Sequence, residues 1–173
     1  MSNKQALREL QQRLAQRMQA AREQPQQASW LAVECAGTPL LFSLLQASEI
    51  FTPVPLQTVP YAQPWLLGVA NLRGGLHTVV DLAAFLGLRE AAAVTRSEGA
   101  RLIAINPDLG INCALMVDRL LGLRGAMQAE TPDAATPRPR FAGAVMRDQE
   151  GRRWQVIDLE ALARHEQFLR IVA

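Results

Sequence analysis

The chain has 173 residues, of which 49% are hydrophobic and 20% charged. This supplies enough apolar material for a packed core and excludes a disordered chain. The 18 basic and 16 acidic residues leave a net charge of +2, which is too small and too scattered for a nucleic-acid-binding surface. Composition therefore favours a globular protein of one compact domain or two very small ones.

Targeting signals and cysteines both favour the cytoplasm. Residues 1–24 are polar and lack the apolar centre of a signal peptide. No apolar run approaches the ~18 residues of a membrane span. Cys35 and Cys113 lie in apolar runs without metal-ligand neighbours at CxxC or CxxH spacing, and a disulfide between them would need an oxidising compartment. We therefore expect a cytoplasmic protein with both thiols reduced.

The N-terminal segment predicts an amphipathic helix. Its apolar residues recur at intervals of three and four, at Leu7, Leu10, Leu14, Met18 and Ala21. Pro25 ends the pattern, so we place this extension at residues 1–25. Because such a helix is marginal alone in water, something must cover its apolar stripe. We favour the chain's own domain as the cover, and the alternative is a partner protein.

After residue 29, short apolar runs separated by turn residues predict strands. We expect them over 30–36, 40–45, 65–72, 76–82, 101–105, 111–117, 141–145 and 154–159. Four prolines make 51–64 an edge or a wrapping segment, since proline cannot donate to a sheet ladder. Gly74-Gly75 is the turn between the third and fourth strands. Residues 83–88 predict a helical turn, 89–99 and 126–140 loops, and 160–171 a closing helix.

The chain contains an internal repeat. Gly68-Val69-Ala70 and the later Val79-Val80-Asp81-Leu82 correspond to Gly143-Ala144-Val145 and Val156-Ile157-Asp158-Leu159. The spacing from Gly to Asp is 13 residues in the first copy and 15 in the second, and the extra residues fall in the turn. Upstream, 39–50 corresponds in position to 111–123. Two copies of a small β unit predict barrels rather than a doubly wound sheet, and each Asp stands at a helix N-cap position.

Motifs for catalysis, metals and cofactors are missing from the sequence. His77 and His165 have no Ser, Cys or carboxylate at a catalytic spacing, and there is no Walker A, dinucleotide or GxSxG motif. Asp81, Asp118 and Asp158 are too far apart in sequence to predict a metal cluster. We therefore expect no catalytic residue, no metal site and no cofactor.

The corner Asn71-Leu72-Arg73-Gly74 is the most informative segment. It puts a long cation at the end of a strand, just before a flexible turn. Arg is suited to directional ion pairs at interfaces, which favours a partner-binding role. The alternative is that Asn71 only bonds its own turn and Arg73 is solvated. Spacing alone leaves both interpretations open.

Several of these segments resemble the CheW-like family of coupling proteins. The most specific match is Trp65-Leu66-Leu67-Gly68-Val69-Ala70-Asn71-Leu72-Arg73-Gly74, followed by Thr78-Val79-Val80-Asp81-Leu82 and Phe85-Leu86-Gly87. Weaker matches keep the family order at Ser48-Glu49-Ile50, at 115–120 and at 141–162. The resemblance covers roughly residues 29–165.

The resemblance implies a fold and a function. The fold is mainly all-β, with two pseudo-repeated, intertwined five-stranded SH3-like barrels around a shared core, flanked by N-terminal and C-terminal helices, in a domain over 29–173. The function is that of a non-catalytic adapter at membrane receptor arrays. Its partners are the regulatory domain of a CheA-type histidine kinase and the tip of a methyl-accepting chemotaxis receptor, with no nucleic acid and no direct membrane insertion.

The resemblance also implies where partners bind. By the motif match, Arg73 and Glu49 form a charge pair near the receptor groove, at the corner that also contains Asn71, Leu72 and Gly74. A groove between the barrels is expected to be apolar, and our candidates for its lining are Leu44 and Val117. Charges at its rim affect specificity and association rate more than affinity.

Two departures from the family pattern refine the interpretation. His77-Thr78 stands where the family often has an apolar residue and Pro. Three features resemble the PilI branch of the family more than flagellar CheW. They are the N-terminal helix, the Pro-rich segment 51–64 and the sequence of residues 65–71. The PilI branch serves type IV pilus twitching motility, with a PilJ-like receptor.

Alternatives from other classes remain. They are a flagellar CheW paralogue, a fragment of a CheV-type protein, and a small β-barrel binding module of unknown ligand. An enzyme would show a pocket holding His77 beside a carboxylate. A nucleic-acid-binding barrel would need exposed aromatics on a basic face, and aromatics are only 5% of the chain.

Overall fold

Short strands dominate the computed structural model, which describes residues 3–23, 30–91 and 97–173. The helices are α1 (Asn3–Glu23), α2 (Leu82–Phe85), α3 (Leu159–Ala163) and α4 (Glu166–Leu169). The strands are β1 (Trp30–Cys35), β2 (Thr38–Ser43), β3 (Ala47–Phe51), β4 (Leu66–Leu72), β5 (Gly75–Asp81), β6 (Arg101–Ile105), β7 (Cys113–Val117), β8 (Arg119–Arg124), β9 (Gln128–Ala129), β10 (Ala142–Arg147) and β11 (Arg153–Ile157). A 3₁₀ turn, Pro107–Leu109, separates β6 from β7.

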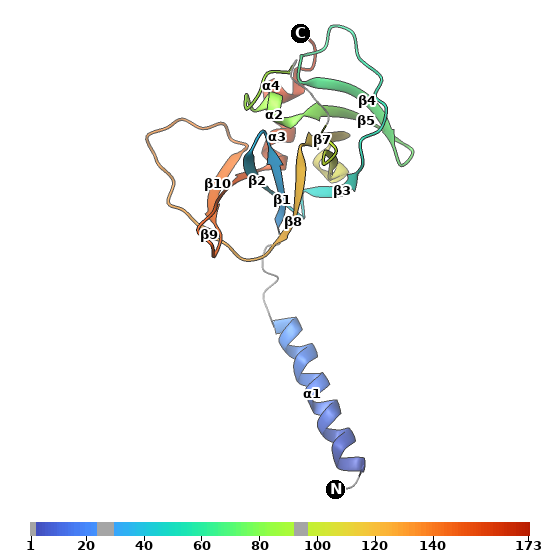
Figure 1. Ribbon diagram of the computed structural model, residues 1–173, viewed down its shortest axis with the longest axis vertical. Coiled ribbons are helices and arrows are strands. Elements are labelled where there is room, and N and C mark those ends of the chain that lie inside the picture. Colours follow the sequence, from blue (N-terminus) through green and yellow to red (C-terminus); the bar gives the residue numbers. More distant parts are fainter. Residues whose placement is uncertain (1–2, 24–29, 92–96) are drawn as a thin grey trace.

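The strands form two sheets that lie against each other (Figure 1). One has the order β8-β1-β2-β11-β10-β9 and the other the order β3-β6-β7-β5-β4. The predicted paired barrels are confirmed, with the two-residue β9 added to one of them.

The two barrels exchange parts of the internal repeat. The hairpin β4–β5 corresponds to β10–β11, β1–β2 corresponds to β6–β7, and β3 corresponds to β8. In each sheet, the strand that leads to the repeated Asp pairs in parallel with a strand of the other repeat. These pairs are β5 with β7 and β11 with β2. Each barrel therefore takes one hairpin from the other half of the chain, which explains how the barrels are intertwined.

Three apolar clusters fill this arrangement. The largest is shared, because it takes side chains from both sheets, among them Leu31, Phe42, Ile103, Leu115 and Val117. The five-stranded barrel has its own small interior, made of Ala70, Leu72, Val79, Leu102, Ala114 and Met116. Ala32, Leu41, Trp154 and Val156 fill the six-stranded one. The shared core locks the barrels together as one body.

The Pro-rich segment wraps the five-stranded barrel, as predicted. Gln57 and Val69 exchange two backbone hydrogen bonds of 2.9 and 2.8 Å, which cover the outer edge of β4. Gly68 makes this close approach feasible: its φ is +146°, and a Cβ there would lie 2.3 Å from the carbonyl oxygen of Gln57.

Some expected elements differ from the structure. β3 and β8 were not predicted as strands, and the two-residue β9 lies in the segment 126–140 that was expected to be a loop. The predicted helix over 160–171 is two short helices, because His165 is extended (φ −75°, ψ 127°) and interrupts the turn pattern. The interruption brings Phe168 against Trp65, with stacked rings whose centroids are 6.0 Å apart.

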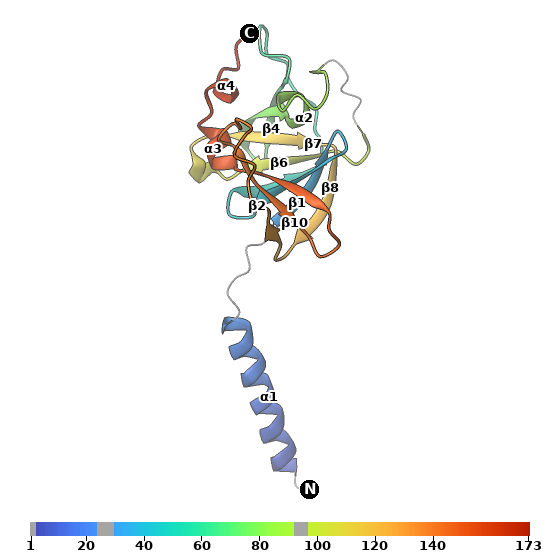
Figure 2. The same cartoon turned by 90° about the vertical axis from the view of Figure 1, so that its left-hand side faces the viewer.

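Helix α1 projects away from the barrels (Figures 1 and 2). Its four large apolar side chains, Leu7, Leu10, Leu14 and Met18, are each more than half exposed. The prediction that the chain's own domain covers the stripe is therefore wrong. Between these residues stand Arg and Gln, whose polar groups would also lose water if the helix packed on the domain.

Candidate partner-binding site

The turn between β4 and β5 holds the predicted corner in a strained shape. Arg73 and Gly74 form its two central residues, with φ of +49° and +80°, so the turn begins one residue earlier than predicted. The Asn71 side chain accepts a hydrogen bond from the Gly74 N–H at 2.9 Å, and so bonds its own turn. A left-handed conformation costs a residue other than Gly about 1 kcal/mol. Gly or Asn would serve the fold better than Arg73.

Arg73 forms the expected ion pair with Glu49. The Arg73 Nη1 and Glu49 Oε1 atoms lie 2.6 Å apart, and the side chains are 76% and 40% exposed. Glu49 belongs to β3 and Arg73 to the β4–β5 turn, and β3 and β4 are the two edges of the five-stranded sheet. The pair therefore bridges the two edges of this barrel. An exposed pair contributes less than about 1 kcal/mol to stability, so it does not by itself explain the strained Arg73.

Exposed apolar side chains line the edge strands on the face of the shared core. Ile50 on β3 stands opposite Ile103, and Leu120 and Leu123 on β8 stand opposite Val33 and Leu31. Residues opposite each other in a ladder point to the same face of the sheet. Ile103, Val33 and Leu31 belong to the shared core, whereas Ile50, Leu120 and Leu123 are exposed. We call these three residues the apolar rim.

The predicted site residues fall into two groups. Arg73, Glu49, Asn71 and Gly74 lie together at the corner, and Leu44 is 38% exposed in the turn after β2. Leu72 and Val117 are buried, in the interior of the five-stranded barrel and in the shared core respectively. Their predicted place on a binding surface is corrected: strand alternation turns both side chains inward, so they support the surface from below.

Sequence reasoning missed a buried ion-pair cluster centred on Arg89. This guanidinium binds Asp81 through two contacts of 2.7 and 3.2 Å, and Asp118 through one of 2.7 Å. Asp118 also accepts from the Ala36 N–H, and the Asp81 side chain caps α2 by accepting from Ala84 at 3.3 Å. The cluster thus connects the end of β5, the start of β8 and the β1–β2 turn. The one sign of this cluster in the sequence was the predicted N-cap role of Asp81. The structure confirms this role, and also the predicted N-cap role of Asp158.

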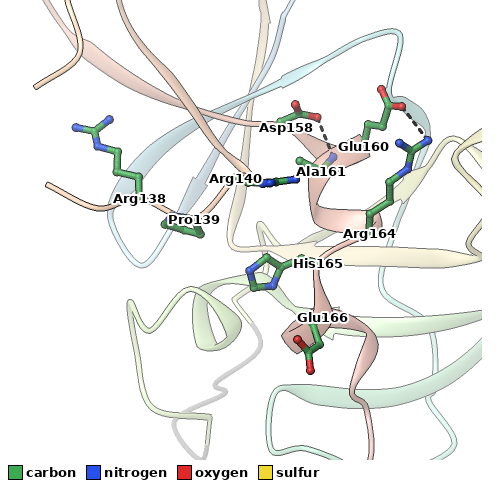
Figure 3. A pocket seen from close by; sticks show the side chains of 9 residues that line it. All are labelled: Arg138, Pro139, Arg140, Asp158, Glu160, Ala161, Arg164, His165 and Glu166. Atoms are coloured by element: carbon green, nitrogen blue, oxygen red, sulfur yellow. Dashed lines mark hydrogen bonds and ion pairs between the residues drawn. The ribbon is translucent and has the colours of Figure 1, made fainter. Parts of the chain in front are cut away.

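A cavity of about 750 Å³ lies between loop 138–140 and the α3–α4 junction (Figure 3). It is lined by Arg138, Pro139, Arg140, Asp158, Glu160, Ala161, Arg164, His165 and Glu166. Glu160 pairs with Arg164 at 3.2 Å, and Asp158 caps α3. No lining side chain is a hydroxyl or a thiol, so His165 has no side chain of that kind to activate as a nucleophile there. The other histidine, His77, donates from Nδ1 to the Gly75 carbonyl at 2.9 Å.

The thiols and the acidic residues do not form a reactive centre in the described part of the chain. Burial, reinforced at Cys35 by nearby Asp118, raises the pKa of both Cys35 and Cys113 to about 12, so neither forms a thiolate near neutral pH. Both are free. Within residues 3–23, 30–91 and 97–173, no three His, Cys, Asp or Glu side chains are arranged to hold a metal ion. Nor is any helix of this part long and apolar enough to cross a membrane.

Comparison with known proteins places these features in a family. Residues 29–167 match the family model described as a CheW-like domain. The chain is 27% identical to Protein PilI of Pseudomonas aeruginosa over 164 residues, which are 92% of this chain and 88% of that protein. It is 35% identical to a probable chemotaxis protein CheW of Rhizobium etli over 54 residues, 31% of this chain and 35% of that protein.

A solved structure shares the fold. The scaffolding protein TtCheW from Thermoanaerobacter tengcongensis matches with a TM-score of 0.66 at 18% identity, over 79% of this chain and 88% of that one. The likeness supports the two-barrel architecture. The match over residues 29–167 establishes that the chain belongs to the CheW-like family, whose members are non-catalytic.

Proposed function

We propose that this protein couples a methyl-accepting chemoreceptor to a CheA-type histidine kinase at membrane receptor arrays, in the control of type IV pilus twitching motility. Family membership supports the adapter role. The likeness to Protein PilI, which extends over 92% of this chain, supports the pilus branch over a flagellar one. The receptor is then of the PilJ-like kind, and the kinase binds through its regulatory domain.

The observation that carries the proposal is the strained, exposed Arg73 paired with Glu49. The fold does not need an Arg at a left-handed turn position, and the ion pair adds little stability. Strain that the fold does not require is typical of functional positions. In the proposal, a receptor helix lies on the apolar rim and meets this corner. Arg73 and Glu49 then exchange partners with charges on the receptor.

The rim supplies affinity and the corner supplies specificity. Ile50, Leu120 and Leu123 are 45%, 37% and 68% exposed, so each has apolar area left to bury. Burying the remaining surface of such side chains contributes on the order of 1 kcal/mol each. The paired charges already satisfy each other in the free protein, so their exchange changes partner choice more than total affinity.

The test separates the two partners. Arg73→Ala and Glu49→Ala are each titrated against the kinase regulatory domain and assayed for kinase activation in receptor-containing membranes. We expect both variants to stay folded, to bind the kinase domain as wild type does, and to lose receptor coupling. Arg170→Ala is the matched control, because Arg170, the residue after α4, pairs with Glu166 at 2.7 Å and its side chain is also largely exposed, at 66%.

A charge-exchanged double variant, Arg73→Glu with Glu49→Arg, distinguishes two roles of the pair. It preserves an internal ion pair but reverses both charges toward a partner. We expect it not to restore coupling. Full restoration would mean that the pair only shapes the corner, and the proposed contact with the receptor would then be wrong.

A genetic test assigns the pathway. Deletion of the gene is expected to abolish twitching on a surface and to leave swimming unchanged. Loss of swimming chemotaxis with normal twitching would favour the flagellar alternative, to which the 35% identity with the probable chemotaxis protein CheW of Rhizobium etli over 54 residues also points.

A further inference from the structure

Helix α1 presents an apolar stripe that no part of the described fold covers. Leu7, Leu10, Leu14 and Met18 are 57%, 56%, 53% and 58% exposed. Both views show the helix standing clear of the barrels, and so free to lie along a surface (Figures 1 and 2). A helix of 21 residues with an uncovered stripe gains stability from whatever surface receives it.

The spacing of the stripe fits a flat surface better than a coiled coil. Leu7 and Met18 are 11 residues apart, and so are Leu10 and Ala21. An 11-residue period is close to that of a straight α-helix, so the stripe runs along the axis without left-handed supercoiling. A seven-residue period would instead put Arg17 into the seam, which a left-handed coiled coil disfavours.

The charges of α1 are sorted around the stripe. At 100° per residue, the helical period sets Arg13 on one side of the stripe and Arg8 on the other. Glu9 falls on the far side, away from the stripe. A receiving surface must therefore be apolar at the centre and negatively charged on both sides.

This charge pattern selects among the surfaces that could receive the helix. A second copy of α1 would bring basic flanks against basic flanks, which is repulsive. An anionic lipid surface has the required chemistry, since acyl chains accept the apolar stripe while phosphates meet Arg8 and Arg13 on its two sides. We propose that α1 is a peripheral lipid-binding arm, which lies in the interface of an anionic membrane without crossing it.

The experiment uses the full chain and vesicles that contain neither receptor nor kinase, so its outcome is independent of the proposed adapter function. Binding is measured by co-sedimentation with vesicles of phosphatidylglycerol and phosphatidylcholine in equal parts, and with phosphatidylcholine alone. We expect binding to be roughly tenfold or more tighter on the anionic vesicles. Added salt should weaken it, and helical circular dichroism should increase on binding.

Three variants locate the contact. The double variant Leu10→Gln with Leu14→Gln removes the centre of the stripe and should abolish sedimentation. Arg13→Gln removes one flanking charge and should weaken binding about fivefold. Gln12→Ala, on the far side of the helix, is the control and should bind as wild type does. Since α1 stands apart from the barrels, all three should leave their unfolding transition unchanged.

Two results would overturn the proposal. Equal binding to both kinds of vesicle would show that phosphate charge is not recognised. Absence of lipid binding, combined with weaker binding of the kinase domain or the receptor by the stripe variant, would show that a protein rather than a membrane receives α1.

Discussion

Replacement of Arg89 by Met tests whether the buried ion-pair cluster holds the two barrels together. Arg89 is 17% exposed and Asp81 is fully buried, while Asp118 is 21% exposed. Burial disfavours the guanidinium charge, but the hydrogen bonds to Asp81 and then to Asp118 outweigh it and raise the pKa of Arg89. The guanidinium therefore stays charged across the whole range of native pH.

The expected loss follows from what Met leaves behind. Without the guanidinium, the Ala84 N–H at 3.3 Å is the one hydrogen-bond donor that the described residues leave to the buried Asp81 carboxylate. Breaking a buried pair by removing one partner costs about 3–5 kcal/mol. A whole domain is stable by only about 5–15 kcal/mol. At about 2–4 °C per kcal/mol for a chain of this size, the melting temperature should fall by roughly 6–20 °C.

Urea unfolding, followed by tryptophan fluorescence, to which the fully buried Trp154 contributes, measures the loss. Arg73→Ala, which breaks an exposed pair, should cost less than about 1 kcal/mol and serves as the control. Adding Asp81→Asn to Arg89→Met removes the stranded charge and should restore much of the lost stability. A loss below about 1 kcal/mol in Arg89→Met, or a double variant less stable than the single, would refute the argument.

Three further predictions concern the rest of the fold. Gly68→Ala should lower the free energy of unfolding by about 1–3 kcal/mol and loosen the Pro-rich segment, because the new Cβ meets the Gln57 carbonyl. Gly151→Ala is the control: Gly151 has a φ of +83° and open space around it, so this variant measures backbone strain alone. If both variants lose the same free energy of unfolding in urea, the close approach of Gln57 is not the reason for a glycine at position 68. Cys35 and Cys113 should not react with Ellman's reagent at pH 8 in the native protein and should both react in urea; a fast native reaction would contradict their burial and raised pKa. Hydrogen bonds from Arg147, and next from Arg153, lower the pKa of Glu130 in the folded protein. The ionised Glu130 therefore stabilises the fold above its unfolded-state pKa, and this contribution is lost as the pH falls through its lower folded-state pKa. Thermal melts of Glu130→Gln and wild type should therefore differ near pH 7 and converge in acid, and a difference that grows in acid would contradict this.

Much of the architecture was predictable because it is encoded locally. The repeat around Gly68 and Gly143 predicted two barrels, and the hairpin turns and the N-caps of Asp81 and Asp158 follow from short-range rules. The exchange of hairpins between the barrels was not predictable, since it depends on which strands pair over long distances. β8 was missed because its residues do not alternate between covered and exposed. β3 does alternate, but Glu49 is on its less exposed face and Ile50 on its more exposed one, so polarity does not follow exposure there.

The candidate site was predicted only in part, for a similar reason. The Arg73–Glu49 pair came from the family resemblance, and the structure places the two side chains in contact. Val117 was expected at a groove, but an apolar residue in a strand does not reveal which face is covered until the second barrel is in place. Arg89 looked like part of a polar loop, because its two carboxylates lie 8 and 29 residues away in sequence, which is no local motif spacing.

Calorimetric titration of the purified chain against the regulatory domain of the CheA-type kinase from its own organism is the decisive experiment on the proposed adapter role. We expect saturable binding by wild type, by Arg73→Ala and by Glu49→Ala alike, with only the two variants failing to couple receptors. If no CheA-type regulatory domain of that organism binds, the protein is not a kinase adapter, and a double-barrel binding module of unknown ligand remains.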